Sequence, residues 1–254
     1  MTKEKKLSYF KNELNYIKEE NLKKFLEVAI ENMEDYVFTR EASSTGKYHP
    51  LSDLGEGGLL RHIKTVFYLG VELLKLEHYQ DIFTEHEQDL LLISLLLHDA
   101  KKYGDNEERK HTKVELSLLC GNWLASEIFE GIISEEDRQI ICDCILAHSG
   151  QWNTNKKGEE ILPKPIDKRT FFVHLCDYIA SRRFLNVDLS VIDDTIKKAV
   201  EPKDFVITFG AKHKGETLET IYNKDKEYLF WAVNNMRIEP ARTYIRKFME
   251  EKNE

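Results

Sequence analysis

The 254-residue chain has few of the features that mark secreted, membrane-spanning or disulfide-rich proteins. Its four cysteines form no CxxC pair, which argues against a zinc ribbon or a disulfide scaffold. The longest apolar run, Leu90 to Leu97 with Ser94 inside it, is too short to cross a bilayer. Four of the first six residues are charged, and the segment lacks the apolar stretch of a secretory signal. We therefore expect a cytoplasmic protein with reduced, buried thiols and no membrane contact.

Positive charge is also scarce. The chain has 37 Lys and Arg against 45 Asp and Glu, a net charge of −8, so it lacks the basic footprint that is typical of nucleic-acid-binding proteins. Residues 202–254 hold ten basic and nine acidic residues, so the acidic excess lies in residues 1–201. This distribution argues against a long polyanion bound along the first 201 residues. The 41% of hydrophobic residues nevertheless supports a packed core.

Apolar residues recur at helical spacing along most of the chain. The pattern predicts a helical domain over residues 1–200, with helices over about 59–76, 89–102, 112–129, 135–147 and 168–183. The pattern changes at Pro202, after which Asp204 to Thr208 is β-branched and aromatic and predicts a strand in a short hairpin. Helices over about 217–235 and 239–251 follow. We expect a mostly all-α protein with a small α+β module at residues 203–254.

Histidine and aspartate stand at the ends or in the interior of these apolar helices. An imidazole and a carboxylate at the end of a buried helix are costly unless they are paired, hydrogen-bonded or bound to a metal. A single histidine at a helix end is usually structural, but an ordered set of such residues favours a metal site. Imidazole and carboxylate together select ions such as Mn, Fe, Co, Ni or Zn over Ca. The set comprises His62, His98, Asp99, His111, His148 and Asp177.

The order of these residues resembles the HD superfamily of metal-dependent phosphohydrolases, which is named for an adjacent His-Asp pair. The segments Gly57 to His62 and His98 to Lys102 are similar to the family's first-helix and His-Asp-x-x-Lys segments. The resemblance covers residues 45–185 and implies a helical bundle that binds one or two divalent ions (Mn, Fe, Co, Ni, Zn or Mg). It implies a first metal held by His62, His98, Asp99 and Asp177, and a second, bridged by the catalytic Asp99, held by His111 and His148. The implied reaction is hydrolysis of a nucleotide-like phosphoester by a metal-activated water.

Several further residues are candidates for contact with that substrate. Lys102 lies one helical turn beyond Asp99, where it can meet a phosphate oxygen and assist catalysis. Arg61, Arg182 and Arg183 are candidate phosphate contacts, and each is equally compatible with a solvated role. Trp152, in the loop after His148, either stacks on a base or packs on its own domain as a lid.

Residues 205–235 resemble a second family, the small module at the C-terminus of exodeoxyribonuclease X. The matching segments are Ile207-Thr208-Phe209-Gly210, Lys212-His213-Lys214-Gly215 and Tyr228-Leu229-Phe230-Trp231, while Ala211 and Glu216 depart from the pattern. The resemblance implies contact of Lys212 and Lys214 with single-stranded nucleic acid; the alternative is a stabilising or oligomerising appendage. Three functions stay open: a hydrolase of small nucleotides, a nuclease acting on single-stranded nucleic acid, and a nucleic-acid-binding protein with a non-catalytic metal site. The oligomeric state is not specified by these patterns.

Overall fold

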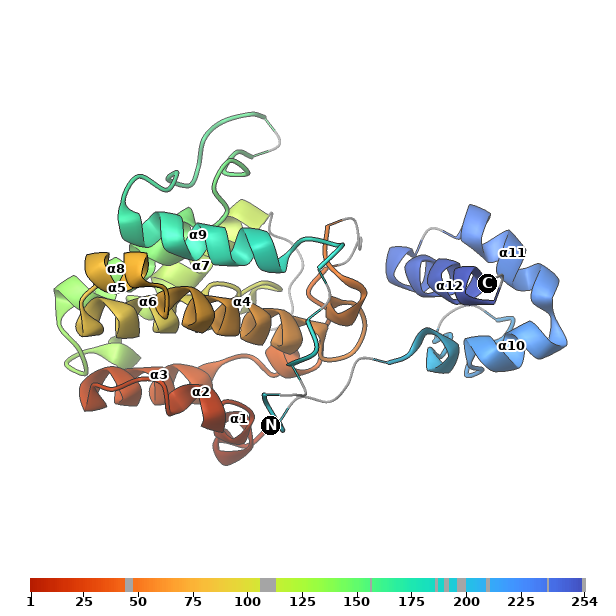
Figure 1. The fold of residues 1–254 in the computed structure, drawn as a ribbon, viewed down its shortest axis with the longest axis horizontal. Helices are drawn as coiled ribbons and strands as arrows, with labels where there is room; N and C mark the ends of the chain where they lie inside the picture. The colour runs from red at the N-terminus through yellow and green to blue at the C-terminus, as the bar shows by residue number, and fades with distance from the viewer. Residues whose placement is uncertain are drawn as a thin grey trace.

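The computed structural model is helical nearly throughout and contains no named β-strand in the part of the chain that it describes (Figure 1). None of the described helices is both long and apolar enough to traverse a bilayer. The residues described are 1–43, 48–105, 113–155, 157–185, 187–189, 192–195, 200–208, 211–236 and 238–252.

The N-terminal helices form one side of the larger helical body (Figure 1). They are α1 (Lys3–Tyr9), α2 (Lys11–Leu14) and α3 (Glu20–Asn32), followed by the 3-10 turn η1 (Asp35–Phe38). The apolar side chains that sequence periodicity picked out, such as Phe10, Phe25 and Ile30, are buried in the main hydrophobic cluster. Helical spacing therefore identified correctly which face of these helices packs inward.

The centre of the body is formed by α4 (Gly58–Leu74) and α6 (Glu85–Leu97), which pack on each other and on α8 (Glu135–Ala147) and α9 (Lys168–Ala180). The short α5 (Glu77–Ile82) connects the first pair, and α7 (Lys113–Leu124) with the 3-10 turn η4 (Glu127–Phe129) covers α8. The predicted helices in this region are present, but the one predicted over 89–102 ends at Leu97 and the one predicted over 112–129 ends at Leu124. A Cβ on Gly70 would lie 2.2 Å from Cδ1 of Leu95, so this glycine permits the close contact of α4 with α6.

Local signals set the start of three of these helices. Thr84 and Glu87 form a reciprocal capping box at the start of α6, with Glu87 N donating to Thr84 Oγ1 at 3.1 Å. Ser134 caps α8 by accepting from Asp137 N at 3.0 Å, as the sequence predicted. Asp167 caps α9 by accepting from the backbone of Arg169. These caps determine where His98, His148 and Asp177 fall relative to the helix ends.

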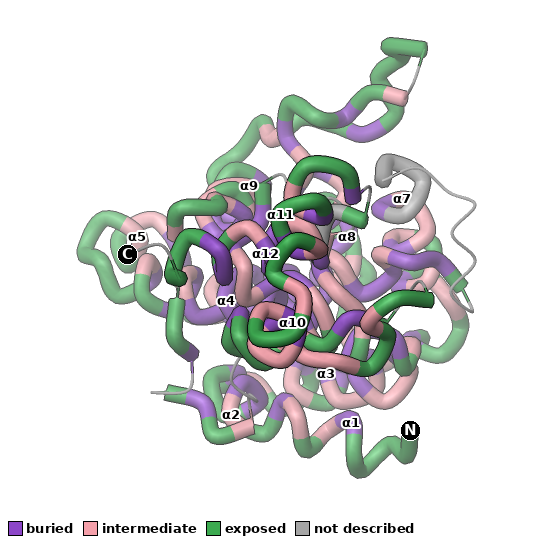
Figure 2. Tube along the Cα trace, turned by 90° about the vertical axis from the view of Figure 1, so that its right-hand side faces the viewer, coloured by how far each residue is buried: buried purple, intermediate pink, exposed green. Residues whose placement is uncertain are grey.

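A second, smaller hydrophobic cluster lies at the C-terminal end of the chain. It is built by the 3-10 turn η6 (Pro202–Asp204) and by α10 (Leu218–Lys224), α11 (Lys226–Asn235) and α12 (Glu239–Glu251), which we call the C-terminal bundle. The bundle stands beside the N-terminal body in Figure 1, and in Figure 2, viewed from its side, exposed residues cover much of α11 while residues of intermediate exposure are the most frequent on α10. Leu54 belongs to this cluster although it lies 148 residues before Pro202 in the chain.

The predicted strand in this region is reduced to a single antiparallel bridge between Val206 and Thr217, so the expectation of an α+β module is corrected. Ile207 N donates to Glu216 O at 3.0 Å beside that bridge. The pairing stops because Thr217 is already the N-cap of α10, where its side chain accepts from Thr220 N. The segment paired with Val206 therefore continues as helix α10 directly after the bridge. Phe209 and Gly210, which the hairpin prediction also used, lie outside the described residues.

Candidate metal centre

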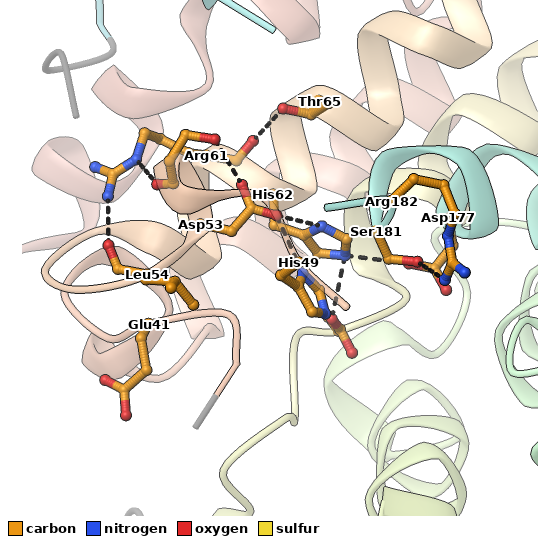
Figure 3. A network of polar contacts seen from close by, with 12 residues as sticks. Glu41, His49, Asp53, Leu54, Arg61, His62, Thr65, Asp177, Ser181 and Arg182 are labelled. Carbon is orange, nitrogen blue, oxygen red and sulfur yellow. Dashed lines mark hydrogen bonds and ion pairs between the residues drawn. The ribbon is translucent and has the colours of Figure 1, made fainter. Parts of the chain in front are cut away.

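Four of the six predicted ligands come from α4, α9 and the end of α6 and meet at one point (Figure 3 shows His62 and Asp177 there). The Nε2 atom of His62 lies 3.1 Å from Asp177 Oδ1, 3.4 Å from His98 Nε2 and 3.6 Å from Asp99 Oδ2. His98 Nε2 lies 3.5 Å from Asp99 Oδ2 and 3.6 Å from Asp177 Oδ1. Ligand atoms about 2.1 Å from one ion stand about 3.0 to 3.4 Å apart in octahedral or tetrahedral geometry. His62, His98 and Asp99 are therefore close enough to share a single ion, and Asp177 lies within 3.6 Å of both histidines.

Backbone contacts orient the histidines so that Nε2 faces the centre. His98 Nδ1 donates to the carbonyl of Leu95 at 2.7 Å, and His148 Nδ1 donates to the carbonyl of Ile145 at 2.6 Å. Because a carbonyl only accepts, each neutral ring carries its proton on Nδ1 and leaves the Nε2 lone pair for a metal. Both histidines are the C-cap residues of their helices, so the carbonyl one turn back is near Nδ1. The position of each histidine at a helix end, by which the sequence indicated it as a ligand, thus explains why its Nε2 atom faces the centre.

Electrostatics also match a cation site. Burial opposes ionisation of Asp177, but the hydrogen bond from His62 and the charge of His98 outweigh it and hold the pKa of this carboxyl far below its usual range. Burial likewise opposes ionisation of Asp99, and Lys102 and His98 lower its pKa well below the usual value. Burial disfavours protonated His62, yet hydrogen bonds to Asp177 and Asp53 raise its pKa to about 9. Lys102 and His62 supply positive charge beside the two carboxylates, and the donor set of two imidazoles and two carboxylates fits a borderline divalent ion.

A carboxylate that the sequence did not single out stands behind His62. Asp53 is buried, and its Oδ2 lies 3.2 Å from His62 Nδ1 and 3.1 Å from His49 Nδ1. His49 lines the cavity over the centre, and its largely buried imidazole lies beside the ring of His62, with centroids 4.7 Å apart. Burial is the main cause that lowers the pKa of His49 to about 4, against the opposing bond to Asp53. Asp53 sits in a segment without periodicity, so no sequence signal indicated it.

The remaining predicted metal ligands are only partly placed. His148 is buried at the same site, with its ring centroid 5.2 Å from that of His98, and its pKa is lowered by burial and by His98. His111 lies outside the described residues. His174 donates from Nδ1 to the carbonyl of His148 at 2.7 Å, just beyond the end of α8.

The candidate substrate residues separate into two groups. A cavity of about 210 Å³ opens over the centre, and its lining includes Lys102, Arg182 and Trp152 together with His148. Lys102 forms a close ion pair with Asp99. Arg61, in contrast, is buried away from the cavity, where its guanidinium donates to the carbonyls of Ser52, Leu54 and Glu56 (Figure 3 shows its bond toward Leu54). Arg183 is exposed outside the cavity lining. The structure thus brings Lys102, Arg182 and Trp152 to the centre and leaves Arg61 and Arg183 elsewhere.

The two basic residues predicted to contact nucleic acid lie in the turn before α10. Lys212 forms an ion pair with Asp225 at 2.5 Å and stands over the ring of Tyr228 at 5.4 Å, and Lys214 is exposed. His213 between them adopts a left-handed conformation with φ +62° and bonds to Glu216 and Asp225. Carboxylates of the C-terminal bundle itself therefore hold this turn in place.

Comparison with known families bears on the class of the metal centre. Residues 59–182 match the family model of the HD domain. This segment is similar to an HD domain. The matched segment includes all six ligand-type residues and runs from the start of α4 to Arg182 just beyond α9, so the resemblance found in the sequence is confirmed for this segment. HD domains constitute a superfamily of metal-dependent phosphohydrolases, which agrees with the buried His and Asp cluster.

The other comparisons add no relative. No curated protein and no solved structure shows a significant match to the chain. The HD match ends before the C-terminal bundle, and the resemblance of residues 205–235 to the module of exodeoxyribonuclease X has no support from the comparisons.

Proposed function

We propose that the chain is a metal-dependent phosphohydrolase that cleaves a phosphoester of a small, nucleotide-like substrate. The observation that supports this most is the convergence of His62 with His98, Asp99 and Asp177, the last three of which line a cavity, in the segment that matches the HD domain. A divalent ion held by these four side chains would polarise the phosphoester and lower the pKa of a coordinated water. His148 and His111 are the proposed ligands of a second ion, with Asp99 between the two sites.

The basic residues of the cavity are placed to hold the phosphate. The Lys102 ammonium now pairs with Asp99, and sharing of that carboxylate with a metal would free Lys102 to contact a phosphate oxygen. Arg182 donates from Nε to Tyr178 O and from Nη2 to Ser181 Oγ. A guanidinium carries five N–H donors, so three remain for a phosphate. Because the ions and these two side chains bring positive charge to one place, the overall charge of −8 does not oppose binding of a small phosphorylated molecule.

Aromatic groups at the cavity favour a substrate that carries a base. Trp152 stacks on Tyr178 with centroids 5.9 Å apart and an interplanar angle of 12°, and 48% of Trp152 remains exposed. The guanidinium of Arg182 lies 4.0 Å from the centroid of Tyr178 and 6.0 Å from that of Tyr48. Flat faces of this kind bind a nucleobase by stacking. The cavity volume of about 210 Å³ is below the range of about 300 to 1,000 Å³ typical of larger ligands, which favours a small substrate.

The test is a hydrolysis screen with Mn, Ni and Mg over nucleoside mono- and triphosphates, cyclic nucleotides and single-stranded oligonucleotides. We expect activity on a small nucleotide that Asp99→Ala abolishes, while Asp143→Ala, which removes an exposed carboxylate on α8, leaves activity unchanged. Equal activity of the Asp99 variant and the wild type would refute the proposal.

A second experiment tests the base contact. Trp152→Ala should raise KM for a nucleotide several-fold with little change in kcat, because base stacking contributes about 1 to 3 kcal/mol. The matched control is Phe184→Ala, which removes an aromatic ring that is 83% exposed and outside the cavity lining. An unchanged KM for Trp152→Ala would instead favour its role as a lid that packs on its own domain.

A nuclease that acts on single-stranded nucleic acid is the second candidate. The observation that favours it is the exposure of Phe230 and Trp231 on α11, with Lys226 over the ring of Phe230 at 5.5 Å. Bases can stack on such rings while Lys212, Lys214 and Lys226 contact phosphates. A mobility-shift assay on single-stranded DNA with Trp231→Ala tests this. Affinity without hydrolysis would point to a nucleic-acid-binding protein with a non-catalytic metal site.

A further inference from the structure

A loop that leads into α4 connects the metal centre to the C-terminal bundle. This site loop comprises residues 48–57 and contains the 3-10 turn η2 (Leu51–Asp53). Asp53 projects from it to the Nδ1 atoms of His62 and His49, at 3.2 and 3.1 Å (Figure 3). Asp53 is almost fully buried, at 1% exposure, so its carboxylate is committed to these imidazoles rather than to solvent. His62 Nδ1 is buried with no hydrogen-bond partner, and the Asp53 carboxylate lies within ion-pair distance of it.

The residue that follows Asp53 points the other way. Leu54, also 1% exposed, packs in the hydrophobic cluster of the C-terminal bundle and not in that of the N-terminal body, and Leu51 packs against the same cluster. Tyr244 of α12 reaches the loop with its hydroxyl, which lies 3.3 Å from the carbonyl of Leu54 and 3.4 Å from that of Leu51. The ring of Tyr244 is itself held by stacking on Phe205, with centroids 4.3 Å apart.

The loop is also held by the HD domain. Arg61 of α4 donates to the carbonyls of Ser52, Leu54 and Glu56. A Cβ on Gly58 would lie 2.0 Å from the Asp53 carbonyl oxygen, so glycine is required where α4 begins against the loop. Asp53 is thus placed by a peptide segment whose carbonyls are bound by Arg61 on one side and by Tyr244 on the other. Loss of either support would change the position of the carboxylate.

We infer that Tyr244 of the C-terminal bundle is a positioning residue for the metal centre, acting through the site loop and Asp53 on the ligand His62. A carboxylate that accepts from the distal nitrogen of a metal-binding histidine fixes its tautomer and ring orientation, and loss of such a partner lowers metal affinity about 10- to 100-fold. The inference rests on the metal binding that the proposed function assigns to His62. It gives the C-terminal bundle a role in the centre that does not depend on nucleic-acid binding.

The test measures the Mn affinity of the metal-free full chain by competition with a chelating indicator, with thermal melts to verify folding. Asp53→Asn should weaken Mn binding about 10- to 100-fold. Tyr244→Phe should weaken it about two- to tenfold, the range of one neutral hydrogen bond, and the double variant should lose no more than Asp53→Asn alone, because both act on His62 through one path. Tyr222→Phe, the same change in the same bundle at a ring that packs on Phe248, should bind Mn as the wild type does.

Each other result counts for or against the inference. Additive losses in the double variant, or an unchanged affinity of Tyr244→Phe, would overturn it, and so would a wild-type chain that binds no divalent ion. If Tyr244→Phe does not fold, Phe205→Leu replaces it, since removing the stacked ring releases Tyr244 while keeping its hydroxyl. Mn binding without hydrolysis of any phosphoester would refute the proposed function and leave this inference intact.

Discussion

The buried ammonium of Lys64 offers the sharpest test of what holds the N-terminal body together. Lys64 lies on α4 and is fully buried, with Nζ 2.9 Å from both carboxylate oxygens of Glu13, in close contact with Asp193 and 2.8 Å from Thr195 Oγ1. These partners come from α2 and from the segment after α9, so one charge joins three parts of the chain. Lys64→Met keeps much of the volume and removes the charge. Two buried carboxylates then share a site without their cation.

The expected cost is large because breaking a buried ion pair from one side leaves an uncompensated charge, at about 3 to 5 kcal/mol. For a chain of this size each kcal/mol lowers Tm by about 2 to 4 °C, so we expect a decrease of about 10 °C. Burial raises the pKa of Glu13 to about 7 despite the opposing effect of Lys64. The folded state therefore binds this proton more tightly than the unfolded state, and stability from this group is greatest below pH 4.5 and falls as pH rises through 7. The deficit of the variant should accordingly be larger at pH 8 than at pH 5.

The assay is urea unfolding of wild type, Lys64→Met and Lys75→Met at both pH values. Lys75 pairs with Glu72 at 2.6 Å but is 61% exposed, so its removal should cost little stability. Addition of Glu13→Gln to Lys64→Met should recover part of the loss, since it removes one of the two unpaired charges. The reasoning is refuted if Lys64→Met costs no more than Lys75→Met, or if its cost is the same at pH 5 and pH 8.

Three further predictions concern the centre and its supports. Mn affinity should rise about tenfold per pH unit up to about pH 9, because the metal must displace a proton from His62. Burial disfavours that proton, but Asp177 and Asp53 stabilise it and raise the pKa of His62 to about 9. Isothermal titration in two buffers measures the released proton, and an affinity that does not change with pH contradicts the prediction. Gly150→Ala should destabilise the fold by more than 1 kcal/mol, since φ is +58° and the new Cβ would lie 2.2 Å from His174; an unchanged melting temperature would show that this packing is absent. Arg61→Lys should lower the melting temperature and leave KM unchanged, because Arg61 binds loop carbonyls outside the cavity; a raised KM with a normal melt would restore the phosphate role.

Much of the fold was predictable because its determinants are local. The spacing of apolar residues identified α4, α6, α8 and α9, and capping residues such as Ser134 marked their first turns. The strand expected at Asp204 to Thr208 was wrong because β-branched and aromatic residues also suit a buried extended segment. Ile207 is buried in the C-terminal bundle without a partner strand, apart from the bridge between Val206 and Thr217. Whether such a segment pairs depends on what lies beside it, which the local pattern does not contain.

The residues of the candidate site also divide into those that the sequence indicated and those that only the structure revealed. His98 and His148 could be recognised because each caps an apolar helix, and His62 and Asp177 because they interrupt buried helical faces. Asp53 could not, since its loop has neither periodicity nor motif and its role arises only from the position of His62. Arg61 and Arg182 are alike in sequence, each next to a proposed ligand segment, yet one binds loop carbonyls and the other lines the cavity.

The chain by itself therefore determined which residues can bind a metal and on which helices they lie, because residue chemistry and helical periodicity are properties of neighbouring positions. The scarcity of positive charge indicated a small substrate in advance of any geometry. Only the tertiary structure decided that Asp53 supports His62, that Leu54 belongs to the C-terminal cluster, and that Tyr244 binds the same loop. These contacts join residues up to 193 positions apart, and such pairs are set by the packing of whole helices rather than by any local pattern.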